Sequence, residues 1–302
     1  MKKKVLISGG SGLLGKRLSQ MLKQRDYSVS HLSRSKTSSM EGVSVIQWDV
    51  KNQKLEAEKI KDFDHIIHLA GAGIVDEPWT DKRKKIIEES RTKSAELLVK
   101  AVAANTQKPI SFVSASAVGY YGFRTLEKEF HEEDQAGHDF LADTCVAWEK
   151  SVDVMKELDI PTAKIRIGII LSDKGGALAE MAKPVKMGFG APLGSGKQYM
   201  PWIHIDDLCR IFIQAMEEKW EGAFNGGAPK QVNNKEFTKT LAKVLHKPLW
   251  LPNLPAFVMK VILGKRALLV LEGSRVSTEK VKKKGFEFTY PELESALKEI
   301  YF

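Results

Sequence analysis

The chain has 302 residues and a formal net charge of +9, and 43% of its residues are hydrophobic and 28% charged, which is ordinary for a soluble globular protein. Its two cysteines, Cys145 and Cys209, have neither metal-ligand nor disulfide-framework spacing, and no apolar run reaches the ~18 residues of a transmembrane helix. The basic residues alternate with acids, as in residues 81–89, so the charge does not indicate nucleic-acid binding. The N-terminus has no signal-peptide core, and together these features favour a cytoplasmic protein without membrane or nucleic-acid partners.

The first expected elements are a strand at residues 5–7 and a helix that starts near residue 16, joined by a glycine-rich turn. Glycines allow a tight turn and let the backbone approach a pyrophosphate, whose charge then lies at the helix N-terminus. Three glycines alone are a weak signal, but here they stand between a strand and a helix, and a second strand pattern follows about 20 residues later. The turn therefore predicts dinucleotide binding. The candidate cofactor-binding residues are Gly9, Ser11, Gly12, Leu13, Leu14 and Gly15.

The second expected strand, residues 27–32, bears on which dinucleotide is bound. Sites that prefer NAD usually carry a carboxylate at the end of this strand, where it binds the ribose 2′-hydroxyl. No acid occurs between Asp26 and Glu41, and the strand ends instead in Ser33 and Arg34. A guanidinium suits a 2′-phosphate through charge-assisted hydrogen bonds, although a solvated basic loop is the alternative interpretation. We therefore predict NADP(H) as the cofactor, with Ser33 and Arg34 in its site.

Strand and helix patterns continue to alternate through the first half of the chain. Such alternation predicts parallel strands joined by crossovers, which is an α/β doubly wound sheet of the Rossmann type. Ligands bind at the carboxyl ends of these strands, so Asp49 after the third strand and Leu69, Ala70 and Gly71 after the fourth join the cofactor candidates. The further elements expected are strands at 43–48, 64–69, 110–114 and 162–167, and helices at about 81–104 and 145–158.

The pattern changes after Ile170, where glycine-rich stretches and loops follow. Residues 202–208 lead into a helix for which Asp206 or Asp207 is the expected N-cap, and 251–271 reads as an amphipathic helix. We predict a nucleotide-binding domain of residues 1–170, to which 200–225 return. A smaller α/β substrate domain is predicted from residues 171–199 and 226–302, with the cleft between the two.

Several motifs accompany the glycine turn over nearly the whole length: residues 68–71, 114–116, 166–171 and 204–207. With them the sequence resembles the extended short-chain dehydrogenases/reductases, which include nucleotide-sugar epimerases and dehydratases. It is most similar to the "epimerase family" branch, which residues 114–122 and Trp148-Glu149 mark. The resemblance implies an NAD(P)-binding Rossmann fold and a small, anionic or nucleotide-linked (sugar-like) substrate.

One departure from the resemblance concerns the Tyr-x-x-x-Lys pair of active members. Their lysine binds the nicotinamide ribose and lowers the tyrosine pKa, so that the tyrosine exchanges a proton with substrate. Aligning Glu149 with the glutamate that commonly follows the lysine puts Cys145 at the lysine and Leu141 at the tyrosine. The usual acid/base pair is therefore missing.

Ser116, Tyr120 and Tyr121 are the remaining catalytic candidates. Ser116 falls where the superfamily places a substrate-orienting hydroxyl, and its structural alternative is a hydroxyl that satisfies the turn after the strand. The two tyrosines either supply a phenol or pack the loop. Cys145, His68 and His204 are interpreted as structural.

Three functions compete on this evidence. The first is an NADP(H)-dependent oxidoreductase or epimerase with atypical acid/base groups. The second is a non-catalytic NADP(H)-binding redox sensor or partner-binding protein, and the third is a non-redox enzyme that keeps the cofactor as a structural element. The missing pair favours the second, whereas the glycine-rich loops of the expected second domain favour the first.

Overall fold

The structure is a computed structural model, which describes residues 2–38 and 40–302. Seven parallel strands form one sheet in the order β11-β7-β5-β4-β1-β2-β3. The chain moves outward from β1 to β3 and then resumes at β4 on the other side of β1. The topological switch point, where folds of this type have their ligand crevice, is therefore at the carboxyl ends of β1 and β4. This architecture confirms the predicted doubly wound α/β fold. The strands are β1 (Lys4–Ser8), β2 (Ser28–Ser33), β3 (Ser44–Gln47), β4 (His65–His68), β5 (Ser111–Ala117), β7 (Thr162–Ile167) and β11 (Gly222–Gly226).

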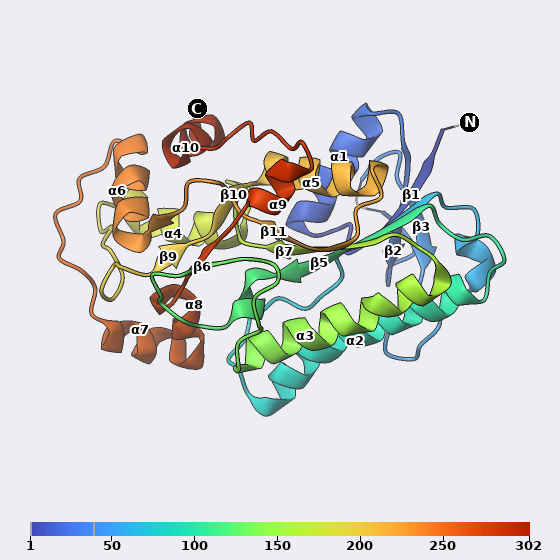
Figure 1. The fold of residues 1–302 in the computed structure, drawn as a ribbon. Helices are drawn as coiled ribbons and strands as arrows, with labels where there is room; N and C mark the ends of the chain where they lie inside the picture. Colours follow the sequence, from blue (N-terminus) through green and yellow to red (C-terminus); the bar gives the residue numbers. More distant parts are fainter. Residues whose placement is uncertain (1, 39) are drawn as a thin grey trace.

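Helices cover both faces of the sheet (Figure 1), with α1 and α5 on one face and α2 and α3 on the other. Val5 and Ile7 pack into the core on the α1 and α5 side, and Leu6 packs into the core on the α2 side. Because both faces are covered, the strands need apolar side chains on both sides, which explains their continuous apolar runs. The helices are α1 (Leu13–Gln24), α2 (Asp81–Ala103), α3 (Phe140–Asp153) and α5 (Ile205–Glu217), with short 3-10 turns η1 (Ala57–Ile60), η2 (Val118–Tyr121) and η3 (Val154–Leu158).

Several element boundaries differ from the expected ones, among them those of β5, α3 and α5. β5 extends to Ala117, so the 114–116 motif lies within the strand instead of after it. α3 begins at Phe140, because the Asp139 side chain accepts hydrogen bonds from the first-turn N–H groups. α5 is capped by His204, whose Nδ1 accepts the N–H of Asp206; neither expected aspartate is the N-cap.

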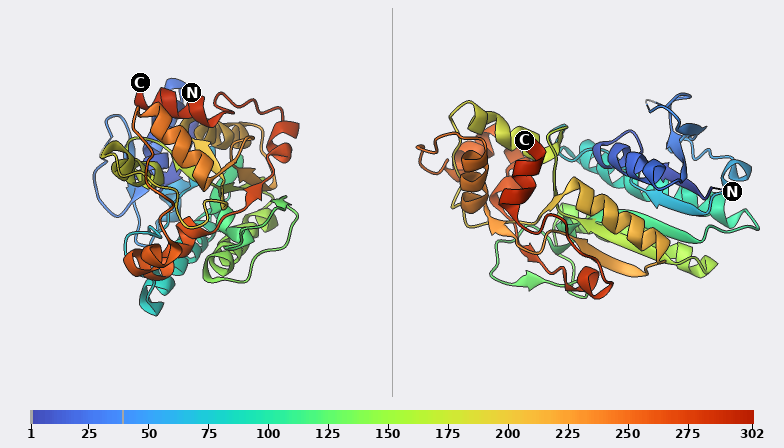
Figure 2. Two further views of the ribbon diagram at one scale, coloured as in Figure 1. Left: turned by 90° about the vertical axis from the view of Figure 1, so that its left-hand side faces the viewer. Right: turned by 90° about the horizontal axis from the view of Figure 1, so that it is seen from above.

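A second group of elements lies beyond the carboxyl ends of the strands (Figure 2) and has its own apolar core, which includes Trp202, Phe237 and Leu241. The segment 202–226 returns to the sheet through α5 and β11. Val281 and Phe286 also pack on the core of the sheet, although they fall in the range expected to belong to the smaller domain. The domain boundaries therefore stay a prediction. The elements are α4 (Gly176–Lys186), α6 (Asn234–Val244), α10 (Leu293–Tyr301), β8 (Ile169–Leu171), β9 (Tyr199–Met200), β10 (Trp202–His204) and β12 (Val232–Asn233).

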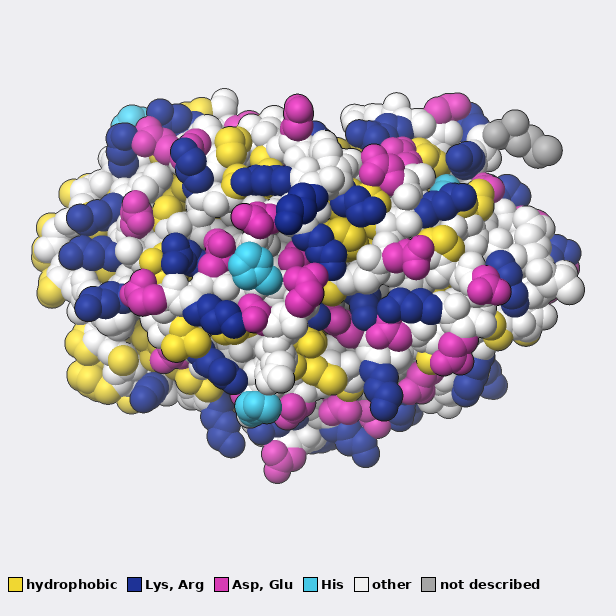
Figure 3. Space-filling model, viewed as in Figure 1, with side chains coloured by type: hydrophobic (Ala, Val, Ile, Leu, Met, Phe, Trp, Pro, Cys, Tyr) yellow, Lys and Arg dark blue, Asp and Glu magenta, His cyan; other side chains and the backbone are white. Residues whose placement is uncertain are grey.

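The amphipathic helix expected at 251–271 is broken into shorter pieces. Gly264 has φ +57 and ends the first piece, so the apolar side chains do not form one continuous buried stripe. Phe257 and Val261 are exposed. Hydrophobic side chains gather over α7 at the lower left of Figure 3, whereas basic and acidic side chains are interspersed over the rest of this face. Within the described residues, every helix is too short or too polar to cross a membrane. The remaining elements are α7 (Ala256–Leu263), η4 (Gly264–Ala267), α8 (Leu268–Leu271), α9 (Glu279–Lys283), β6 (Glu129–Phe130) and β13 (Arg275–Val276).

Candidate functional site

The turn between β1 and α1 has room only for glycine at three positions. Gly9 has φ +70, and a Cβ there would lie 2.8 Å from the Leu69 carbonyl group. A Cβ on Gly15 would lie 2.5 Å from the Gly9 oxygen, and one on Gly10 would lie 2.3 Å from the His31 ring. Sequence reasoning did not single out Gly10, because only the fold brings His31 beneath it. The turn therefore approaches β4 through bare backbone.

The helix that follows this turn begins without a side-chain cap. Its N-cap is Gly12, and the first turn holds no acidic residue. Leu14 and Gly15 are buried, whereas Ser11 and Gly12 are exposed. The uncapped N–H groups and the positive end of the helix dipole together make this helix start suited to bind an anion.

The next strand end carries Ser33 and the exposed side chain of Arg34. The Arg34 carbonyl accepts a hydrogen bond of 3.3 Å from Gln47, and its guanidinium makes no ion pair with any described residue. Asp49, after the neighbouring β3, accepts hydrogen bonds from the N–H and the side chain of Asn52, which lower the pKa of its carboxyl. Among the described residues, the Arg34 guanidinium therefore has no carboxylate partner, and Asp49 is hydrogen-bonded to Asn52 instead.

A buried hydrogen-bond network ties the ends of β1 and β4 together. Ser8 Oγ lies 2.6 Å from His68 Nδ1 and accepts the N–H groups of Leu69 and Ala70 at 3.1 and 3.3 Å. Burial lowers the pKa of His68 to about 4, so the ring is neutral at physiological pH. His68 is a structural residue beneath the crevice.

The Ser116 hydroxyl is buried and donates a hydrogen bond of 2.7 Å to Glu149 Oε1. Glu149 also accepts two bonds from Arg166, from Nε at 2.8 Å and from Nη2 at 3.1 Å. Burial acts to lower the pKa of Arg166, but the hydrogen bonds and charge of Glu149 outweigh it and leave this pKa raised. Ser116 therefore faces α3 and an internal ion pair, and its assignment as a catalytic residue stays a prediction.

The two tyrosines of the same loop have different surroundings. Tyr121 is buried; its hydroxyl donates to Asn225 Oδ1 at 2.7 Å and accepts from Arg166 Nη1 at 3.0 Å. Burial raises the pKa of Tyr121 above its usual value. Tyr120 is half-buried, with its ring centroid 3.4 Å from Arg166 Cζ, and among the described residues its hydroxyl has no hydrogen-bond partner.

The positions that the resemblance assigns to the tyrosine and lysine are occupied by buried, apolar groups. Leu141 packs against Trp79 and Ile87, and a Cβ on Gly119 would lie 3.8 Å from the Cys145 sulfur. Burial raises the pKa of the Cys145 thiol to about 12, which keeps it protonated and unreactive.

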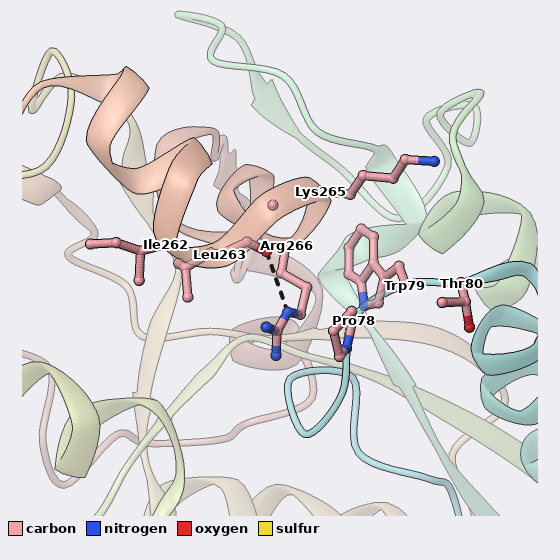
Figure 4. Close-up of a pocket in the computed structure, with 8 residues that line it drawn as sticks. Pro78, Trp79, Thr80, Ile262, Leu263, Lys265 and Arg266 are labelled. Carbon is pink, nitrogen blue, oxygen red and sulfur yellow. Dashed lines mark hydrogen bonds between the residues drawn. The ribbon is translucent and has the colours of Figure 1, made fainter.

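Beside this apolar cluster is a cavity of about 320 Å³ between the segment before α2 and η4 (Figure 4). Trp79 forms one wall and donates its indole N–H to the Ile74 carbonyl at 2.8 Å. Arg266 on the opposite side donates from Nη1 to the Val75 carbonyl at 2.6 Å, which fastens η4 to the loop before α2. The cavity is lined by residues 78–80 and 262–266.

Comparison with known sequences gives matches along the whole chain. Residues 5–141 match the NAD dependent epimerase/dehydratase family, and residues 254–300 match a domain of unknown function (DUF1731). The chain is 35% identical over 299 residues to the epimerase family protein YfhF of Bacillus subtilis, with 98% of this chain and 97% of that protein covered. It is 34% identical over 302 residues to the epimerase family protein SDR39U1 of Homo sapiens, with 98% and 99% covered.

Comparison with solved structures also gives likenesses to epimerases and epimerase family proteins. The human SDR39U1 structure with NADPH has a TM-score of 0.86 at 30% identity and covers 98% of each chain. A nucleoside-diphosphate sugar epimerase from Corynebacterium glutamicum has a TM-score of 0.79 at 28% identity, with 98% of this chain and 57% of that chain covered. The architecture, the glycine turn and these likenesses over nearly the full length agree with one another. The chain belongs to the epimerase family, within the extended short-chain dehydrogenases/reductases.

Proposed function

We propose that this protein is an NADP(H)-dependent oxidoreductase or epimerase that acts on a small, anionic or nucleotide-linked substrate without the usual tyrosine–lysine pair. The observation that carries the cofactor assignment is Arg34, an exposed cation directly after β2 that makes no ion pair with any described residue, in a segment without an acid between Asp26 and Glu41. The human relative with NADPH, 30% identical and aligned over 98% of each chain, supports the same cofactor.

The described residues fit such a dinucleotide. The uncapped start of α1 offers N–H groups and a positive dipole to the pyrophosphate. A Cβ at Gly9, Gly10 or Gly15 would collide with Leu69, the His31 ring or the Gly9 carbonyl, so only glycine allows the tight turn that leads into this helix start. Ser33 and Arg34 would hold the 2′-phosphate through charge-assisted hydrogen bonds. The backbone of Leu69 and Ala70 lies against Gly9 and Ser8 at the start of this turn, and Gly71 follows them after β4.

When bound, the cofactor supplies or accepts a hydride. The chain then has to orient the substrate and move a proton at the oxygen that changes bonding. The hydroxyl groups of Ser116 and Tyr121 are bonded inside the protein. Tyr120 is the candidate whose phenol reaches a substrate without breaking such a bond, so we assign the proton transfer to it.

A second candidate function is a redox sensor that binds NADP(H) without turnover. The buried Leu141 and Cys145 at the positions of the tyrosine and lysine favour it, because neither side chain exchanges a proton near neutral pH. Incubation with carbonyl and nucleotide-sugar libraries distinguishes the two functions, with the absorbance of reduced nicotinamide followed alongside product analysis that detects net-neutral epimerisation. Turnover of any substrate refutes the sensor, whereas binding of NADPH with no turnover refutes the enzyme.

The cofactor assignment is tested by Arg34→Ala. A hydrogen bond to a charged group is worth about 1.5–3 kcal/mol, so NADPH affinity is expected to fall roughly tenfold or more, with NADH affinity nearly unchanged. Titration calorimetry measures both, and Lys36→Ala, an exposed basic residue of the same loop, is the matched control. Equal affinities of the parent protein for NADPH and NADH would refute the assignment.

We also propose the cytoplasm as the compartment of this chain. The proposal rests on the composition and on the cysteine usage described above. The Arabidopsis thaliana relative, 35% identical over 303 residues, is described as chloroplastic.

A further inference from the structure

Arg91, on α2, places a guanidinium between the β4 loop and α3. Its Nη1 donates hydrogen bonds to the carbonyl oxygens of Ala72 at 3.1 Å and Ile87 at 2.8 Å. Its Cζ lies 5.1 Å from the centre of the Trp148 ring, and a Cβ on Gly71 would come within 3.0 Å of it. The guanidinium is therefore fixed against the backbone of the loop that borders the cofactor crevice.

This cation has no counter-ion among the described residues. Arg166 has Glu149 and Arg83 has Glu77, both at 2.8 Å, but no described carboxylate lies within 4.0 Å of Arg91. A buried charge is usually paired, since desolvation without a partner is costly. Burial lowers the pKa of Arg91, and the charged or titratable groups that act on it are Cys145 and Arg83. The guanidinium thus remains a net positive charge in its surroundings.

Two of its nitrogen atoms also remain free to bind a ligand. Nε and Nη2 of Arg91 have no hydrogen-bond acceptor among the described residues. Unlike Arg83 Nε and Trp148 Nε1, which are fully buried without a partner, these two nitrogen atoms are not fully buried. They therefore retain contact with open space. A guanidinium with two free donors beside a crevice is poised to bind oxygen atoms of a ligand.

The place of Arg91 relative to α3 indicates which part of a ligand it meets. Cys145 on α3 stands where the resemblance puts the lysine that binds the nicotinamide ribose, and Arg91 acts on this thiol from α2. Arg91 packs against Gly71. Gly71 is two residues after Leu69, whose backbone lies against Gly9 of the glycine turn. Arg91 thus lies on the side of the crevice away from Arg34 and toward α3.

We propose that Arg91 binds the ribose hydroxyls of the nicotinamide half of NADP(H) and makes the site prefer NADPH over NADP⁺. The proposal rests on the cofactor binding proposed above. The nicotinamide ring is neutral in NADPH and positive in NADP⁺, so an unpaired cation beside it disfavours the oxidised form only. Charge repulsion of this kind is strong where water is partly excluded. The oxidation state of the cofactor would then control how fully the site is occupied.

The test compares three ligands by titration calorimetry: NADPH, NADP⁺ and adenosine 2′,5′-bisphosphate, which lacks the nicotinamide half. We expect the parent protein to bind NADPH about tenfold or more tightly than NADP⁺, and Arg91→Gln to reduce this ratio to within a few-fold. Arg91→Lys, which keeps the charge, should preserve most of the ratio. Binding of the bisphosphate should change by less than a few-fold in both variants, and it also reports that the adenine side is folded.

A matched control is Arg83→Gln on the same helix, where the guanidinium is already paired and the ratio should not move. Equal affinity of the parent protein for NADPH and NADP⁺, or an unchanged ratio in Arg91→Gln, would overturn the proposal. If Arg91→Gln does not bind the bisphosphate, that variant is misfolded and gives no result. The proposal is then judged from the NADPH-to-NADP⁺ affinity ratios of the parent protein and of Arg91→Lys. Failure of the parent protein to bind both NADPH and the bisphosphate would instead refute the cofactor assignment itself.

Discussion

The ion pair between Glu149 and Arg166 offers a strong test of how this fold is held together. Both residues are buried, with 7% and 3% of their surface exposed, and the pair joins α3 to β7 through two hydrogen bonds. Glu149→Gln keeps the size and the ability to accept a bond from Ser116 but removes the charge. Arg166 is then left as a buried cation without a carboxylate among the described residues, whereas Lys164 keeps Asp153 at 2.8 Å.

Removal of one partner of a buried pair costs about 3–5 kcal/mol, because the remaining charge is desolvated without compensation. We expect a loss near the lower limit, about 3 kcal/mol, since the glutamine amide still accepts one of the bonds from Arg166. Urea unfolding measures this change as a shift of the midpoint at constant slope. The matched control is Glu180→Gln, which breaks an exposed pair with Lys183 and should cost at most about 1 kcal/mol.

Replacement of both partners, as in Glu149→Gln with Arg166→Met, should recover part of the lost stability, because no buried charge is then orphaned. A Glu149→Gln variant that unfolds at the same urea concentration as Glu180→Gln would refute this account of the pair.

Two further predictions concern buried groups. Burial lowers the pKa values of His65 and His68 to about 4. Between about pH 6.5 and 4 the unfolded chain therefore binds protons that the folded chain does not. The free energy of unfolding falls as the pH falls through this range, by up to about 1.4 kcal/mol per pH unit for each ring. His68→Asn should make the slope of unfolding free energy against pH shallower between pH 6.5 and 5, and an unchanged slope would count against neutral burial of this ring. Leu141→Tyr with Cys145→Lys rebuilds the superfamily pair and should raise hydride transfer to simple carbonyls by roughly 10²–10⁴-fold over the parent protein, followed by absorbance of reduced nicotinamide and product analysis. A double variant that binds NADPH but shows no gain would mean that these positions do not face the substrate.

The order of strands and helices was predictable from the sequence because it rests on local periodicity and turn chemistry. Continuous apolar runs predict strands covered on both faces, and the 162–167 strand has the expected bounds. The glycine turn was predictable for the same reason, since Gly9 needs its positive φ whatever the rest of the chain does. Boundaries were less certain, because a single cap such as Asp139 moves the start of a helix by several residues.

The candidate site, in contrast, depends on contacts between residues far apart in the chain. Tyr121 and Asn225 are separated by 104 positions, and Ser116 and Glu149 by 33, so no local pattern shows that these polar groups satisfy one another. The sequence alone therefore determined the fold class and the glycine-rich turn before α1. Only the tertiary structure decided which polar groups are paired inside the protein and which, like Arg91, have no counter-ion among the described residues, because pairing of buried charges depends on distances that folding sets.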